Sequence, residues 1–183
     1  MAIASTTTGY LTLQLSKLAG LKVICVADIA RYGERLYEMG ADVLVDRHNP
    51  ERAVQIIRGI TGGNLRYAMD IVGRETATLL QGALREQPQN HSQGKSHLLG
   101  LAGIPKEQDQ KPGFEYHTVP IKLFHTSPAV GENLVTWLEK LLATDNFRLP
   151  ETVHADGGLA GINTALQLLR EGSVSGKRIV VGL

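Results

Sequence analysis

Short apolar runs alternate with segments whose apolar residues recur at helical spacing along most of the chain. The runs are rich in Val and Ile and predict strands over residues 22–27, 43–45, 67–72, 96–101 and 178–181. Strands that alternate with helices are typical of βαβ units and a parallel sheet. The pattern therefore predicts an α/β fold, a Rossmann-like doubly wound parallel sheet with helices on both faces.

Capping residues and glycines indicate where the helices between these strands begin and end. A helix over residues 8–18 stops before Gly20, the next one ends at Gly40, and a third begins at Asn49 and Pro50. Apolar spacing predicts the remaining helices over residues 76–84, 128–142 and 162–169.

The segment 116–125 has a different character because its residues alternate between two faces. Alternation places five side chains on one face: His117, Val119, Ile121, Leu123 and His125. Pro120 lacks a backbone donor, so we expect an edge strand here. An unpaired apolar edge is a liability that pairing with a second copy removes, and the segment predicts a homodimer through strand 116–125.

Composition narrows the classes of protein that the chain can represent. Its 183 residues suit one domain over residues 1–183, and a net charge of +1 without runs of like charge argues against a nucleic-acid partner. No apolar stretch suits a membrane span, and the start lacks a signal peptide, so we expect no membrane partner and a cytoplasmic protein. One cysteine, Cys25, predicts neither a disulfide nor a metal.

A hydroxyl-rich turn ahead of the first helix is the candidate phosphate site. It consists of Ser5, Thr6, Thr7, Thr8 and Gly9. Backbone N–H groups at such a turn can bind a pyrophosphate, although the GxGxxG spacing is absent and a plain Ser/Thr-rich N-cap explains the turn equally well. Residues 1–4 are what remains to form the first strand.

Charged residues at the ends of the second and third predicted strands bear on the choice of nicotinamide cofactor. Asp28 stands where a carboxylate would bond the adenine-ribose hydroxyls and select NAD(H). Arg31 and Arg47 could instead pair with the 2′-phosphate of NADP(H), or be ordinary surface arginines.

Acid/base candidates are weaker. His117 or His125, with Lys122 or Asp70 nearby, could line a pocket and move a proton. The alternatives are that the histidines pack at a rim and that Asp70 ends its strand by bonding the following loop.

Five segments, in order, resemble the zinc-binding dehydrogenase domain of medium-chain dehydrogenase/reductases. They are STTTGYLTLQLSKLAGLKVICVAD, MGADVLVD, LRYAMDIVG, HLLGLAG and GSVSGKRIVV. The chain is similar over essentially its whole length to the fungal zinc-independent branch, which includes trans-acting enoyl reductases of polyketide pathways. The resemblance implies NADP(H) or NAD(H) as cofactor, an activated carbon–carbon double bond as substrate, and a polyketide synthase as partner.

The resemblance also implies roles for individual residues. By it, Ser5, Thr6, Thr7, Thr8 and Gly9 take the pyrophosphate, Asp28 and Arg31 the adenosine ribose, and Val72, Gly73, Gly100, Leu101 and Ala102 the nicotinamide side.

Two departures from the family pattern limit what the chain is expected to do alone. Ile3 stands where relatives tend to have glycine, which hinders close approach to a pyrophosphate. The N-terminal GroES-like catalytic domain of the family is absent from this sequence. We therefore expect a cofactor domain that needs another chain for hydride transfer. The alternatives are a non-redox isomerase or cyclase acting on a polyketide-like substrate in the vacated cleft, and a non-catalytic dimeric scaffold.

Overall fold

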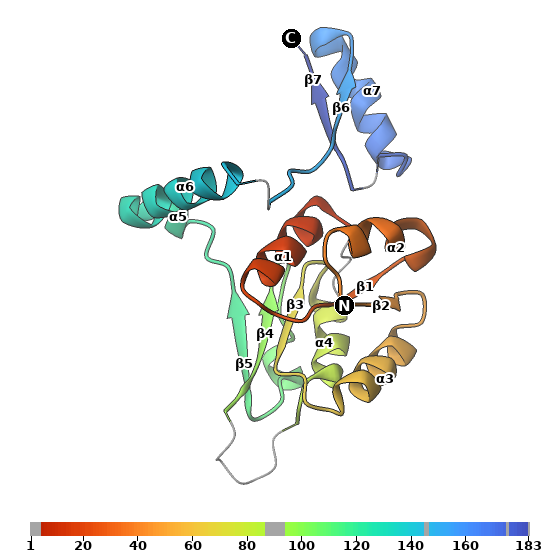
Figure 1. The fold of residues 1–183 in the computed structure, drawn as a ribbon, viewed down its shortest axis with the longest axis vertical. Helices are drawn as coiled ribbons and strands as arrows, with labels where there is room; N and C mark the ends of the chain where they lie inside the picture. Colours follow the sequence, from red (N-terminus) through yellow and green to blue (C-terminus); the bar gives the residue numbers. More distant parts are fainter. Residues whose placement is uncertain (1–4, 87–93, 145–146, 175, 183) are drawn as a thin grey trace.

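Helices and strands alternate along the chain in the computed structural model, which describes residues 5–86, 94–144, 147–174 and 176–182 (Figure 1). The elements are α1 (Thr7–Leu18), β1 (Ile24–Ala27), α2 (Ile29–Glu38), β2 (Val43–Asp46), α3 (Pro50–Thr61), β3 (Tyr67–Asp70), α4 (Arg74–Leu80), the short 3-10 turn η1 (Gln81–Ala83), β4 (Ser96–Gly100), a second 3-10 turn η2 (Glu107–Asp109), β5 (Phe114–Thr118), α5 (Leu123–Thr126), α6 (Pro128–Leu142), β6 (Thr152–Ala155), α7 (Gly158–Arg170) and β7 (Arg178–Val181).

Each strand pair is parallel, as the alternating pattern predicts. β1 pairs with β2, β4 lies between β3 and β5, and β6 pairs with β7. The sheet is thus in three parts where the sequence suggests one. Within the described ranges, the outer edges of β1 and β3 pair with no further strand. The first strand expected from residues 1–4 lies outside the described residues.

Strand β1 separates two hydrophobic cores, which shows that helices cover both faces of the fold. Val26 packs toward one core with residues of α3 and α4, including Ala53 and Leu80. Its neighbours Cys25 and Ala27 point to the other core, built with residues of α1 and α2. Opposite orientation of successive strand residues explains the division. The doubly wound Rossmann-like arrangement is confirmed.

Side-chain caps begin α2 and α3, and the start at Asn49 is the one that the sequence predicts. Asp28 accepts the N–H of Arg31 at the start of α2 (3.2 Å), and Asn49 accepts that of Arg52 at the start of α3 (3.0 Å). Gly62 ends α3 in the left-handed region (φ 58°), a conformation that glycine adopts without a steric penalty.

The prediction of one long edge strand over residues 116–125 is wrong. Strand β5 ends at Thr118, and the chain then turns into the short helix α5. Pro120 cannot donate to β4, and its carbonyl accepts the N–H of Leu123 (2.8 Å), which begins a turn. The alternation therefore breaks at Pro120, and His117 and His125 do not share a strand face.

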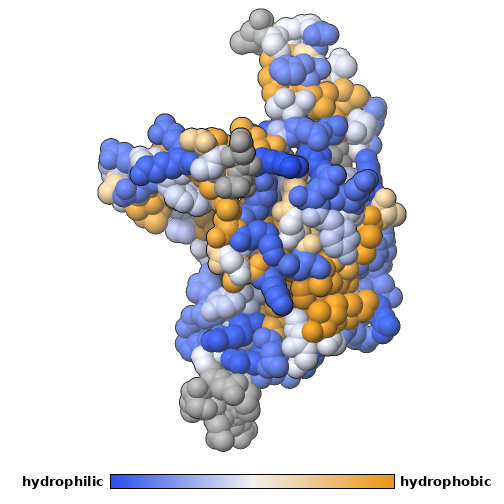
Figure 2. All heavy atoms as spheres, viewed as in Figure 1, coloured by the Kyte–Doolittle hydropathy of each residue, from blue (hydrophilic) through white to orange (hydrophobic). Residues whose placement is uncertain are grey.

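Helices α5 and α6 form an arm that extends from the body containing β1–β5, while β6, α7 and β7 form a separate unit (Figure 1). The amphipathic helix predicted over residues 128–142 is confirmed, but its apolar side is exposed: Trp137 is 49% and Leu134 47% accessible. Figure 2 shows apolar side chains at the surface of this arm and of the α7 unit. No helix in the described part of the chain is long and apolar enough to cross a bilayer.

The C-terminal unit consists of β6, α7, β7 and the segment that leads into β6. Hydrogen bonds and an ion pair connect this segment to α1 and α2. Gln14 and Arg148 exchange two hydrogen bonds, at 3.0 and 2.7 Å between side-chain and backbone atoms. Arg35 lies 3.3 Å from Glu151. The C-terminal unit is therefore fixed beside α1 and α2.

The homodimer stays a prediction, now based on exposed apolar side chains rather than on a long strand. Ile121 is 77% accessible and Val119 53%. We expect self-association in sedimentation or light scattering, and we expect Ile121→Lys to weaken it because burying an ammonium at an interface is costly. The matched control is Leu159→Lys, at a 73% accessible position on α7. A mass that stays monomeric at high concentration, or equal loss in both variants, would contradict the prediction.

Candidate cofactor site

The parallel strands bring most of the predicted cofactor residues to their carboxyl ends. Asp28 directly follows β1 and Arg47 directly follows β2, whose last residues pair with each other. Val72 and Gly73 follow β3, and Gly100 closes β4 opposite Asp70. Leu101 and Ala102 continue from there. Open α/β sheets bind ligands at this end of their strands, so these residues lie where a nucleotide site is expected.

The hydroxyl-rich turn becomes the first turn of α1. Thr6 is the N-cap, and its Oγ1 accepts the N–H of Gly9 at 3.1 Å. The N–H groups of Thr7 and Thr8 have no acceptor among the described residues and can meet an anion. Thr6 and Thr8 are exposed and Thr7 is half-buried.

Ser5 and Gly9 are both buried, in contrast to the threonines of the turn. Gly176, in the loop after α7, comes so close that a Cβ there would lie 2.9 Å from the Ser5 carbonyl oxygen. Ser5 and Gly9 therefore form the buried side of the turn, and the threonines form the side that a phosphate can reach.

Three charged residues beside the turn differ in their freedom to bind a ligand. Asp28 is the N-cap of α2, and its second oxygen faces His48 Nε2 at 3.8 Å. The guanidinium of Arg31 donates to the carbonyl of Gly172 (2.8 Å) and lies over the ring of Tyr32. Arg47 differs because its buried Nε has no hydrogen-bond partner among the described residues.

Asp70 shapes the loop on the expected nicotinamide side. Its fully buried carboxylate accepts the N–H groups of Val72 and Gly73, each at 2.9 Å. Its carbonyl accepts the N–H of Leu101 at 2.8 Å, which ties this loop to the one after β4. Asp70 therefore ends its strand and holds the loop.

Close backbone approach accounts for the glycine at the end of β4. A Cβ at Gly100 would collide with the carbonyl oxygen of Gly103. Any larger residue would therefore open the tight turn that places Leu101 and Ala102.

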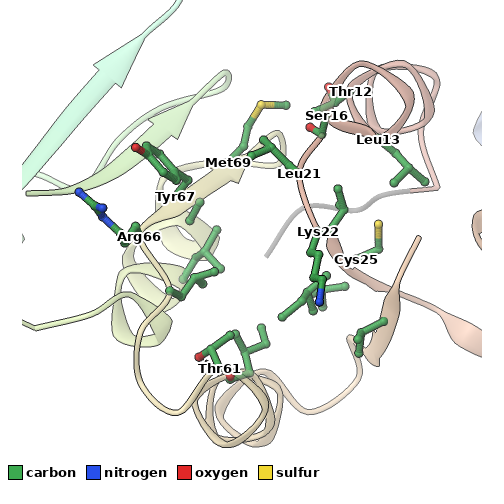
Figure 3. A pocket seen from close by; sticks show the side chains of 18 of the residues that line it. Thr12, Leu13, Ser16, Leu21, Lys22, Cys25, Thr61, Arg66, Tyr67 and Met69 are labelled. Carbon is green, nitrogen blue, oxygen red and sulfur yellow. Dashed lines mark hydrogen bonds between the residues drawn. The ribbon is translucent and has the colours of Figure 1, made fainter. Parts of the chain in front are cut away.

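A groove of about 970 Å³ lies elsewhere, between β1 and β3 (Figure 3). Leu13 and Ser16 of α1, Cys25 of β1, and Tyr67 and Met69 of β3 line it. Of the residues assigned to the cofactor, only Gly9 borders it. The groove follows the edges of the two strands rather than their carboxyl ends, so we do not place the cofactor there.

Burial makes the one thiol in the groove unreactive. Removal from water raises the pKa of the Cys25 thiol to about 12. At neutral pH the group is a protonated thiol, which is neither a nucleophile nor a metal ligand.

The structure separates the acid/base candidates. Lys122 and His125 lie at the exposed helix α5, where His125 packs edge-on against Phe124. His117 instead lies on β5 with its Nε2 3.0 Å from His97 Nδ1. Asp70 is buried in its loop. These residues do not form one pocket.

Sequence reasoning missed His97 and Glu115, which lie beside His117. His97 pairs with Glu115 across β4 and β5, and Glu115 and His117 alternate onto the same face. The signal available beforehand was the spacing Glu-x-His at 115–117. The register that brings His97 alongside is a property of the fold.

Comparison with known proteins identifies the family. Residues 7–119 match the family model described as zinc-binding dehydrogenase, which is more than half of the 183 residues. The chain belongs to the zinc-binding dehydrogenase family, and its resemblance to the cofactor domain of medium-chain dehydrogenase/reductases is confirmed.

Two relatives show which members of the family the chain is similar to. The trans-enoyl reductase caaB of Aspergillus niger is 39% identical over 199 residues, covering 98% of this chain and 52% of that protein. The trans-enoyl reductase BOA5 of Botryotinia fuckeliana is 30% identical over 192 residues, covering 97% of this chain and 50% of that protein. The chain thus spans about half the length of the curated relatives that it matches.

Solved structures show the same fold. The CurK enoyl reductase superposes with a TM-score of 0.78 at 15% identity, over 99% of this chain and 53% of that chain. The quinone oxidoreductase of Escherichia coli, solved in complex with NADPH, gives a TM-score of 0.75 at 18% identity, over 98% and 55%.

The role of Asp70 is testable through stability. Asp70→Ala leaves the N–H groups of Val72 and Gly73 without their carboxylate acceptor, and we expect a loss of about 1–3 kcal/mol in the free energy of unfolding. Asp70→Asn keeps one carbonyl acceptor and should cost less. Urea denaturation measures both, with the exposed Asp156→Ala as control. Equal stability of Asp70→Ala and the control would show that the carboxylate does not hold the loop.

Proposed function

We propose that this chain is the cofactor-binding part of an NADPH-dependent enoyl reductase of polyketide-type metabolism, and that hydride transfer needs a second polypeptide to close the nicotinamide site. The observation that carries the proposal is the gathering of Asp28, Arg47, Val72, Gly73 and Gly100 at the carboxyl ends of parallel strands, beside the start of α1. The names of the relatives, trans-enoyl reductases, support the reaction class.

The residues present fit a dinucleotide at this edge. The N–H groups of Thr7 and Thr8 suit the pyrophosphate, with the positive end of the α1 dipole behind them. Arg47 follows the strand beside Asp28, and its backbone N–H donates to the carbonyl of Ala27 (3.0 Å). Because its buried Nε has no partner, Arg47 is the group that we assign to the 2′-phosphate, which favours NADPH over NADH.

Once bound, the nicotinamide supplies a hydride to an electron-poor double bond. The part of this chain is to bind and orient. The loop held by Asp70 presents Val72 and Gly73 to the nicotinamide side, and the turn after β4 presents Leu101 and Ala102. We assign no proton donor, because Lys122 and His125 lie on the α5 arm and Asp70 holds its loop.

Exposed apolar surface supports the need for a second polypeptide. The side chains of α6 lie open to solvent, including Trp137 and Leu138 at 49% and 41%. Contiguous exposed apolar patches of this kind mark interaction surfaces. We infer that the polypeptide covering this face is the one that supplies the catalytic half.

Nucleotide titration tests the cofactor assignment. We expect the purified chain to bind NADPH in a calorimetric or fluorescence titration, and Arg47→Gln to weaken NADPH by about tenfold or more while leaving NADH nearly unchanged, since a charged hydrogen bond to phosphate is lost.

The matched control is Arg52→Gln, an exposed arginine at the first turn of α3. If the chain binds neither nucleotide, the assignment of a cofactor site to the carboxyl ends of the strands is wrong. Equal weakening of NADH and NADPH by Arg47→Gln would overturn the role of Arg47 alone.

The need for a partner is tested by turnover. We expect no enzyme-like reduction of enoyl thioesters by this chain alone with NADPH or NADH, because orientation in a closed site is worth roughly 7–11 kcal/mol of the barrier. Activity should appear when a partner that supplies the catalytic half is added. Robust cofactor-dependent reduction by the chain alone would contradict this expectation, and product formed without any cofactor would favour the isomerase or cyclase alternative.

A further inference from the structure

Three potential metal ligands converge on one face of the β3–β4–β5 sheet. His97 comes from β4, and Glu115 and His117 come from β5. One ligand atom from each lies within 4.8 Å of the other two. His97 is the second residue of β4, and Glu115 and His117 are the second and fourth residues of β5. The expected cofactor residues Gly100, Leu101 and Ala102 instead lie at and after the end of β4. The cluster is therefore separate from the cofactor site.

The distances between these atoms are close to those in a metal coordination shell. His97 Nδ1 lies 3.0 Å from His117 Nε2 and 3.2 Å from a carboxylate oxygen of Glu115. Ligands about 2.0–2.2 Å from a tetrahedral Zn²⁺ lie roughly 3.3–3.5 Å from one another. The two distances from His97 are therefore within a few tenths of an ångström of this range, and all three atoms lie within 4.8 Å of one another.

Hydrogen bonds between two neutral imidazoles and a carboxylate cannot pair all three of these atoms. A neutral imidazole carries one N–H, and an ionised carboxylate is an acceptor only. His97 Nδ1 faces both His117 Nε2 and a carboxylate oxygen of Glu115. In either tautomer of His97, this nitrogen can make a full hydrogen bond to one of these atoms only. A cation between the three atoms would satisfy all three lone pairs.

Neighbouring side chains hold the ligands in place. The His97 ring is stacked between Tyr67 and His117, with ring centroids 5.3 Å apart in both pairs and interplanar angles of 10° and 24°. Lys95 donates to the other carboxylate oxygen of Glu115 at 2.8 Å, which leaves the oxygen that faces His97 available. Such outer contacts orient metal ligands.

We propose that His97, Glu115 and His117 form a binding site for a divalent transition metal of the zinc class. Two imidazoles and one carboxylate suit Zn²⁺, Co²⁺ or Ni²⁺ rather than Mg²⁺ or Ca²⁺, which prefer sets of oxygen ligands. Three protein ligands leave a coordination position for water or a ligand. Tyr67, His97 and His117 also line the groove between β1 and β3, so the cluster borders this groove.

This proposal departs from the sequence-based expectation of a chain without metal. That expectation rested on one cysteine and on the lack of paired histidines on a helix. The cluster depends instead on the pairing of β4 with β5, which puts residues 18 and 20 positions apart in the sequence side by side.

The test is Zn²⁺ binding by the full chain after removal of metal with a chelator. Competition with a chromophoric chelator should give one equivalent of bound Zn²⁺, and each of His97→Gln, Glu115→Gln and His117→Gln should weaken it by at least about tenfold. The matched control His154→Gln, an exposed histidine on β6, should bind as the unmodified chain does. Absence of Zn²⁺ binding, or equal affinity in cluster variants and control, would overturn the proposal.

A second measurement needs no variant and so does not depend on how well a variant folds. When Co²⁺ is titrated into the unmodified chain, the ring-proton NMR signals of two of the six histidines should be shifted or broadened at one equivalent. Uniform effects on all histidines, or none, would show that the cluster does not bind the ion. Circular dichroism of each variant checks that the fold is kept.

Discussion

Parallel strand pairing is the constraint on which the rest of this structure depends. Parallel neighbours cannot be joined by a tight hairpin, so a crossover returns the chain to the start of the next strand. Here α3 lies between β2 and β3 in the sequence and α2 between β1 and β2. The same crossovers bury β1 between two cores and direct the strand carboxyl ends to the edge where Asp28, Arg47 and Gly73 lie. Connectivity thus produces both the core and the edge at which we expect the cofactor.

The β3–β4–β5 sheet separates two kinds of chemistry along its strands. The expected dinucleotide contacts lie after the last residues of β3 and β4, where N–H groups and tight turns suit an anion. The metal cluster uses other residues: His97 lies three residues before Gly100, and His117 lies opposite Leu99. A cation held by His97, Glu115 and His117 and a dinucleotide at the carboxyl ends can therefore bind without sharing a ligand.

Helix α6 leaves an apolar face exposed to solvent. Helix α6 has the apolar stripe of a helix that packs against a neighbour, yet Leu134 and Trp137 lie open to solvent. The hydrophobic effect favours covering such a face. A helix with this exposed apolar face is suited to pack against another polypeptide segment.

Local interactions are what the sequence by itself determined. The helix start at Asn49, the end at Gly62 and the parallel α/β order follow from the N-cap, the left-handed glycine and the apolar period, which act over a few residues. Alternation failed beyond Thr118, because a period of two does not reveal that Pro120 turns the chain away from β4.

Tertiary structure decided which charged groups are free and which ligands meet. Arg31 is bonded to the carbonyl of Gly172, 141 residues away, whereas the buried Nε of Arg47 has no hydrogen-bond partner among the described residues. His97 meets Glu115 only through the register of β4 and β5. Such contacts join residues far apart in the chain, so their geometry is set by how elements pack and not by the local sequence around each residue.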